Sequence, residues 1–272
     1  MAFFTIDAQL FYEEGNAMKY AHFDSERHPQ DRLIMPKGQV IAGYAIGIIH
    51  LDVWYPLLPG NVVNATSFNF PVRYKLLAGG TQDRVHGADP SIVDSIIKAG
   101  LELEQEGVRA IAGACGYLGN FQHEVSSALN VPVFLSSLLQ VPMIYHALKP
   151  DKRIGILCAD GPAITPHLLK ECGVMPDMPL AVLGLEDQPE FSSITYSKGE
   201  FSFAQIQQEV VDGARKLADE YKDIGAILLE CSDMPPFAWA VQEAVKLPVF
   251  DFITMINWIH QGVTQRPYRG II

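Results

Sequence analysis

Two of the four cysteines in this chain, Cys115 and Cys231, stand where they could move a proton on carbon. A thiolate can take a proton from one face of a substrate while an opposing thiol returns one to the other face. The two residues are equivalent, because residues 101–134 placed over residues 217–250 give 11 identities in 34 positions with the cysteines in register. Unrelated sequences match at roughly one position in 15 to 20, so the chain contains an internal duplication.

Short apolar runs without polar alternation predict strands that are covered on both faces. These runs are residues 45–49, 110–114, 131–134, 153–157, 226–229 and 247–250. Helical patterns at 90–106 and 205–221 lie between them, and such alternation is typical of parallel sheets. We therefore predict an α/β protein of two pseudo-symmetric Rossmann-like lobes, each a parallel sheet flanked by helices. Ligands of these sheets bind at the carboxyl ends of the strands, which places the active site in the cleft between the lobes.

The pattern also divides the chain into segments. Residues 1–39 are rich in charge, have no clear period and are predicted to be an N-terminal extension. The remaining predicted segments are 40–148 as the first lobe with Cys115, 149–250 as the second lobe with Cys231, and 251–272, which we expect to pack back on the first lobe.

The composition argues against several classes of function. Lys and Arg number 20 against 31 Asp and Glu, and the net charge of −11 disfavours nucleic acid and anionic membranes as partners. Four cysteines are too few for a disulfide framework. No two of them are spaced C-x-x-C, which argues against a zinc site and a redox pair, and no metal is expected. The chain has no basic, apolar leader and no run of about 20 apolar residues, so a cytoplasmic location is expected.

The surroundings of the cysteine pair favour an anionic substrate. Each cysteine follows a predicted strand, and helices are expected to begin near Phe121 and Phe237. The free N–H groups and the dipole of a helix N-terminus bind carboxylates. Cys158 and Cys172 have no equivalent in the other half, and we expect them to be buried core residues.

Several motifs resemble one known family. They are the runs 46–52 (IGIIHLD), 59–61 (PGN), 66–72 (TSFNFPV), 114–118 (ACGYL) and 229–236 (LECSDMPP). They resemble the aspartate/glutamate racemase superfamily, which includes arylmalonate decarboxylase, maleate isomerase and the algal dimethylsulfoniopropionate lyase, over about residues 40–265. The resemblance implies a two-lobe α/β fold, Cys115 and Cys231 as the acid–base pair, carboxylate-binding backbone amides in the loop after each, and no cofactor.

The loops after the cysteines depart from the glutamate racemases of this superfamily. Gly116 and Tyr117 follow the first cysteine where those enzymes have Asn-Thr, and Ser232 and Asp233 follow the second where they have Thr-His. The loss of hydrogen-bonding side chains argues against glutamate as the substrate, although Ser232 could replace the family threonine. Three roles are open for Asp233: an acceptor for the Cys231 thiol, a site for a substrate cation, or a helix N-cap.

Three more residues complete the predicted substrate-binding set. Asp52 ends the first motif, and either caps a loop or touches substrate. Thr165 matches a superfamily position that often contacts substrate. Tyr55, together with Trp54 and Tyr117, is a candidate for an aromatic cage around a cation.

These observations lead to one preferred function and two alternatives. The preferred function is a cofactor-independent racemase or epimerase of a small carboxylate, an amino acid or an amino-acid derivative. The first alternative is a lyase, decarboxylase or isomerase in which one cysteine is the base, for example one acting on dimethylsulfoniopropionate. The second is an inactive small-molecule binding protein. The extension and the 258–260 segment are compatible with a homo-oligomer.

Overall fold

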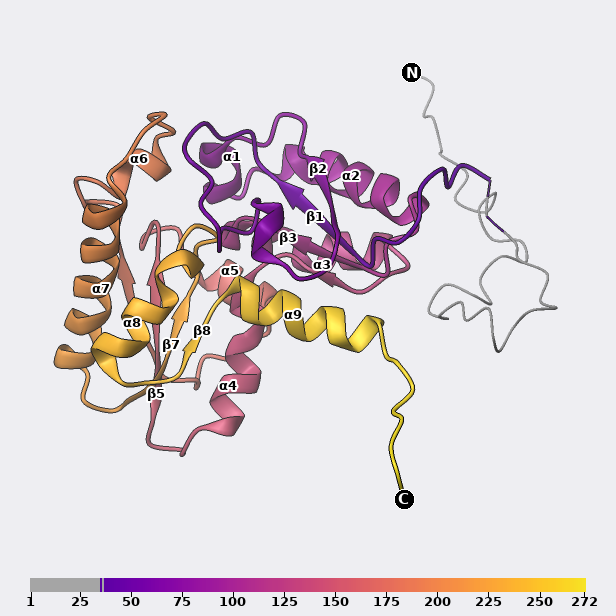
Figure 1. Cartoon of the computed structure of the whole chain (residues 1–272). Helices are drawn as coiled ribbons and strands as arrows, with labels where there is room; N and C mark the ends of the chain where they lie inside the picture. Colours follow the sequence, from indigo (N-terminus) through magenta and orange to yellow (C-terminus); the bar gives the residue numbers. More distant parts are fainter. Residues whose placement is uncertain (1–34, 36) are drawn as a thin grey trace.

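The computed structural model describes residues 35 and 37–272, so most of the predicted N-terminal extension lies outside the described residues. Two lobes lie side by side, each built on its own sheet (Figure 1). Within the described part of the chain, no helix is both long and apolar enough to cross a bilayer.

Each sheet has four parallel strands in the same order. The first sheet runs β2-β1-β3-β4 and the second runs β6-β5-β7-β8. The strands are β1 (Ile46–His50), β2 (Val72–Leu76), β3 (Ala110–Gly113), β4 (Val133–Phe134), β5 (Arg153–Cys158), β6 (Leu180–Gly184), β7 (Ile224–Leu229) and β8 (Val249–Phe250). The predicted α/β fold of two similar lobes is confirmed.

The strands that the sequence pattern missed, β2 and β6, are the equivalent outer strands of the two sheets. An outer strand has one unpaired edge and partial cover, and only Val72 in β2 and Ala181 in β6 are buried. Neither strand therefore has the unbroken apolar run that marks the central strands.

The helices cover the sheets and connect the strands. They are α1 (Gln82–His86), α2 (Val93–Gln105), α3 (Gln122–Ala128), α4 (Val141–Ala147), α5 (Pro166–Glu171), α6 (Ser192–Thr195), α7 (Phe203–Glu220), α8 (Ala238–Val245) and α9 (Phe252–Val263). Short 3-10 helices are η3 (Ala65–Ser67), η4 (Pro90–Ile92), η5 (Gly116–Phe121), η6 (Ser137–Gln140) and η7 (Pro235–Phe237). The two predicted long helices correspond to η4 with α2 and to α7.

The last helix of each half packs against the sheet of the other half. α9 follows β8 of the second sheet, but its apolar face lies against β1 and β3 of the first, where Phe252 and Ile256 share a core with Ile46 and Ala110. Figure 1 shows α9 reaching from the second lobe along the first. α4 follows β4 of the first sheet and contacts β5 of the second. A capping box between Asp251 and Thr254 fixes the start of α9.

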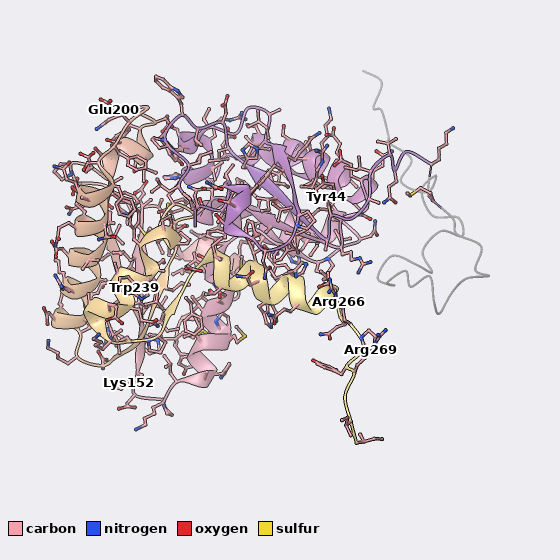
Figure 2. All side chains as sticks on the ribbon, in the orientation of Figure 1. Tyr44, Lys152, Glu200, Trp239, Arg266 and Arg269 are labelled. Carbon is pink, nitrogen blue, oxygen red and sulfur yellow. The ribbon has the colours of Figure 1, made fainter. Side chains whose placement is uncertain are left out.

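The interior is mostly apolar with a few buried polar and acidic side chains, and the cationic side chains of the described residues lie outside it. Cys158 and Cys172 are buried in the main core, as predicted. Lys152, Arg266 and Arg269 lie at the outer edge of the molecule (Figure 2).

Candidate active site

A pocket with about 510 Å³ of empty space, including its open mouth, brings together residues from both halves of the chain. Seven of the nine predicted site residues line it: Tyr55, Cys115, Gly116, Tyr117, Cys231, Ser232 and Asp233.

Cys115 follows β3 and occupies the N-cap position of η5. Its thiol is partly exposed to the pocket. Burial raises the pKa of this thiol, as does the nearby Glu230 when charged, while the backbone N–H groups of Tyr117 and Leu118 lower it. A thiolate at Cys115 is therefore met by two hydrogen-bond donors at the start of a helical turn.

Cys231 follows β7 and has a different environment. Its Sγ lies 3.5 Å from Oδ2 of Asp233, which accepts the thiol proton in a hydrogen bond. Burial raises the pKa of Cys231 well above its ordinary value, and Asp233 and Glu230 raise it further when they are ionised. The two cysteines thus differ in environment, because Cys115 is supplied with donors and Cys231 with an acceptor.

Asp233 is almost completely buried and is held by three donors. Tyr55 donates from its hydroxyl at 3.1 Å, Asn61 donates from its side-chain amide, and Cys231 donates from its thiol. Burial raises the pKa of Asp233, while these donors act in the opposite direction. The hydrogen bonds show the first of the predicted roles for Asp233, as an acceptor for the Cys231 thiol.

The loops after the cysteines are tied to other elements. The Ser232 hydroxyl donates to the carbonyl oxygen of Ala114 at 2.9 Å, which joins the loop after β7 to the loop after β3. The Tyr117 hydroxyl donates to the Asp160 carbonyl oxygen at 2.9 Å and accepts from the Asp160 N–H at 2.7 Å. Both connections cross between the lobes and preorganise the pocket walls.

Two predicted site residues do not line the pocket. Asp52 lies on the exposed segment after β1. Thr165 caps the N-terminus of α5, where its hydroxyl accepts from the Leu168 N–H at 3.2 Å. Since that hydroxyl is engaged in capping the helix, the structure places Thr165 in a structural position.

Three further residues lie at or beside the pocket and were not predicted from the sequence. His86 and Thr195 line the pocket from α1 and α6, two short helices without a readable periodic pattern. Glu230 directly precedes Cys231 in the sequence, but a glutamate at this position gives no sign that it is buried. Only the packing of the two lobes shows what these three side chains face.

Glu230 is fully buried, and neither of its carboxyl oxygens has a hydrogen-bond partner among the described residues. Burial raises its pKa to about 8, although the nearby Ala159 N–H and Tyr117 hydroxyl act to lower it. A buried carboxyl group without partners is costly to a fold, and such groups concentrate at functional sites. Glu230 therefore remains protonated over most of the neutral pH range.

Gly116 is required by the position of Glu230. A Cβ atom at residue 116 would overlap the Glu230 carboxyl group and lie 2.8 Å from its carbonyl oxygen. We expect Gly116→Ala to lower the free energy of unfolding by about 1–3 kcal/mol, because a packed interior cannot absorb the added methyl group. Denaturant unfolding would measure this. Gly262→Ala, on α9 with nothing within 4 Å of the added methyl, is the matched control, and equal stability of the two variants would contradict the prediction.

The chain is similar in sequence to dimethylsulfoniopropionate lyases. It is 33% identical to dimethylsulfoniopropionate lyase 6 of Emiliania huxleyi over 236 residues, which cover 84% of this chain and 62% of the relative. It thus spans less than two thirds of that relative. It is 32% identical to the dimethylsulfoniopropionate lyase of Durusdinium sp. clade D, with 84% of this chain and 77% of the relative covered. No family model matches the sequence.

Solved structures show the same fold at low sequence identity. A mutant of arylmalonate decarboxylase with an associated sulfate ion gives a TM-score of 0.57 at 15% identity, covering 82% of this chain and 94% of that one. The aspartate racemase of Picrophilus torridus gives 0.55 at 15% identity, covering 84% and 96%. The sequence relatives show that the chain belongs to the family of these dimethylsulfoniopropionate lyases, and the solved structures show that it has the fold of arylmalonate decarboxylase and aspartate racemase.

Proposed function

We propose that the chain is a lyase that splits dimethylsulfoniopropionate into dimethyl sulfide and acrylate. The names of its relatives support this reaction. The observation that carries it is a pocket in which a thiol supplied with hydrogen-bond donors lies with a buried carboxyl group, Asp233, and two tyrosine rings. This reaction is the first alternative that the sequence left open.

The reaction needs a base and a leaving group. Cys115, as the thiolate, takes the proton from the carbon beside the substrate carboxylate. The electron pair of that C–H bond forms the carbon–carbon double bond, the C–S bond breaks, and its electrons remain on sulfur. Neutral dimethyl sulfide and acrylate leave, and the proton held by Cys115 passes to solvent. Cys115 is the base because its N–H donors favour the thiolate, whereas Asp233 keeps Cys231 protonated.

The sulfonium group would lie beside Asp233. An ionised Asp233 offers the cation an opposite charge, and the rings of Tyr55 and Tyr117 line the same pocket. Trp54, the third predicted cage residue, is 74% exposed and does not line the pocket. Two tyrosines and one carboxylate therefore form the proposed cation site.

The test is direct. Purified protein is incubated with dimethylsulfoniopropionate, and dimethyl sulfide in the headspace and acrylate in solution are measured. We expect equal amounts of both products from the wild type and from Cys172→Ala, whose substituted side chain lies in the core away from the pocket. Absence of both products from folded wild-type protein would exclude the lyase.

A racemase is the second candidate, because two thiols line one pocket. It would incorporate deuterium at the stereocentre of an amino acid in deuterated buffer without loss of any group. A panel of free amino acids and their N-acyl derivatives, analysed by mass spectrometry and chiral chromatography, separates this activity from elimination.

A further inference from the structure

One wall of the pocket is built from α1 and α6, which carry none of the residues that the mechanism uses. His86 ends α1 and Thr195 ends α6, and both residues line the pocket. Gln82, at the start of α1, donates from its side-chain amide to the carbonyl oxygen of Ile194 at 3.3 Å. This contact holds the two short helices together as one surface.

His86 is oriented by a carboxylate from the other lobe. Its Nδ1 lies 3.0 Å from Oδ2 of Asp160, and its ring centroid lies 4.0 Å from that of Tyr117. Because a carboxylate can only accept, Nδ1 carries the hydrogen and Nε2 is left as the free ring nitrogen. No hydrogen bond to Nε2 is formed by any residue that the structure describes. Asp160 is itself fixed by the two backbone bonds to the Tyr117 hydroxyl.

The charges of the pocket residues single out His86 as the group that could pair with an anion. Among the described residues that line the pocket, it is the only side chain that can become positively charged. Burial lowers the pKa of His86, while its bond to Asp160 and the charges of Asp160 and Asp83 act to raise it. Tyr117 is the other titratable group packed against the ring. In the empty pocket the imidazole is therefore neutral at pH 7.5, and an entering anion would draw a proton onto it.

Thr195 provides a second, independent sign of a ligand at this wall. Its Oγ1 atom is buried and has no hydrogen-bond partner among the described residues. A buried hydroxyl without a partner is uncommon in native folds, and a carboxylate oxygen would satisfy it. Once Nε2 of His86 is protonated, the imidazole and the hydroxyl together offer two donors, which matches the two oxygens of a carboxylate.

We propose that His86 and Thr195 bind the substrate carboxylate, and that His86 takes up a proton as the carboxylate enters. The proposal rests on the proposed function for the identity of the substrate. It orients the zwitterion, with the sulfonium beside Asp233 and the carboxylate at the α1–α6 wall. His86 is then a substrate-binding residue held in place by Asp160.

The probe is 3-(trimethylammonio)propanoate, which keeps both charges of the substrate but has a poor leaving group. Calorimetric titration at pH 7.5 in two buffers of different ionisation enthalpy measures protons taken up per molecule bound. We expect uptake approaching one proton for the wild type and none for His86→Gln, with affinity lower by about 10- to 100-fold. Thr195→Val should keep the uptake and lose about 3- to 10-fold in affinity. His123→Gln, at an exposed histidine of α3, should match the wild type.

Two comparisons make the outcome decisive. Ethyltrimethylammonium lacks the carboxylate and should bind without proton uptake and equally well to wild type and His86→Gln. With dimethylsulfoniopropionate, we expect the KM of the wild type to increase with pH, because proton uptake by His86 becomes less favourable. His86→Gln should raise KM and remove this pH dependence, while kcat changes much less. Proton uptake and affinity unchanged in His86→Gln would overturn the proposal even if dimethyl sulfide is formed. If the wild type forms no dimethyl sulfide yet shows the His86-dependent uptake, the lyase fails and the carboxylate site stands.

Discussion

Cys115→Ser is expected to lower kcat for dimethyl sulfide release by about 10²–10⁴-fold, the range contributed by a well-placed general base. Serine keeps the size of the side chain and its place at the start of η5. Its hydroxyl ionises far less readily than a thiol, so the backbone N–H groups of Tyr117 and Leu118 no longer stabilise a useful base. Headspace measurement of dimethyl sulfide at saturating substrate gives kcat directly.

Cys231→Ser is the matched comparison. Its hydroxyl can still donate to Asp233, as the thiol does at 3.5 Å. We expect a loss of about 10-fold, because in the proposed mechanism Cys231 holds Asp233 and does not carry the transferred proton. Equal losses of 10³-fold or more in both variants would contradict this division of roles and favour the racemase, which needs two proton-transferring thiols.

Glu230→Gln is expected to make the protein more stable at pH 8 by up to about 5 kcal/mol, with little change near pH 5. Burial raises the Glu230 pKa from near 4.5 to about 8. Between these values the unfolded chain releases the proton while the folded protein keeps it, so stability falls as pH rises from about 4.5 to about 8. Glutamine has the same shape and no proton to lose, which removes this part of the pH dependence.

Urea unfolding at intervals from pH 5 to pH 8.5 would measure the effect. Glu124→Gln, at an exposed glutamate of α3, controls for the removal of one carboxylate and should keep the wild-type slope. Parallel stability curves for wild type and Glu230→Gln would show that the folded protein does not hold the Glu230 proton.

The cysteine pair could be predicted because identical residues at a constant offset reveal the duplication. The asymmetry of the pocket leaves no such pattern in the sequence. Asp52 and Asp160 occupy equivalent places after β1 and β5. The structure leaves Asp52 exposed and brings Asp160 to His86. The reason is that α1 of the first lobe lies over Asp160 of the second lobe and not over Asp52. A helix of five residues has too short a pattern to predict, so this difference between the halves is visible only in the fold.

Burial of Glu230 could not be predicted for a related reason. Glutamate at the end of a strand is ordinarily solvated, and the sequence gives no record of which surface the neighbouring lobe covers. Gly116, one position after the equivalent cysteine, leaves the space that Glu230 fills. The two residues are 114 positions apart, and neither explains the other until the lobes are placed together.

The crossing of α4 and α9 gives the chain the architecture of a domain-swapped homodimer joined into one polypeptide. Each half lends its last helix to its neighbour, so neither half is a self-sufficient folding unit. A fragment ending at residue 148 would lack the cover that Phe252 and Ile256 give to the first sheet. Its own α4 would be left without β5 to pack on. The two lobes should therefore unfold in one cooperative transition, and separately expressed halves should become ordered only when mixed.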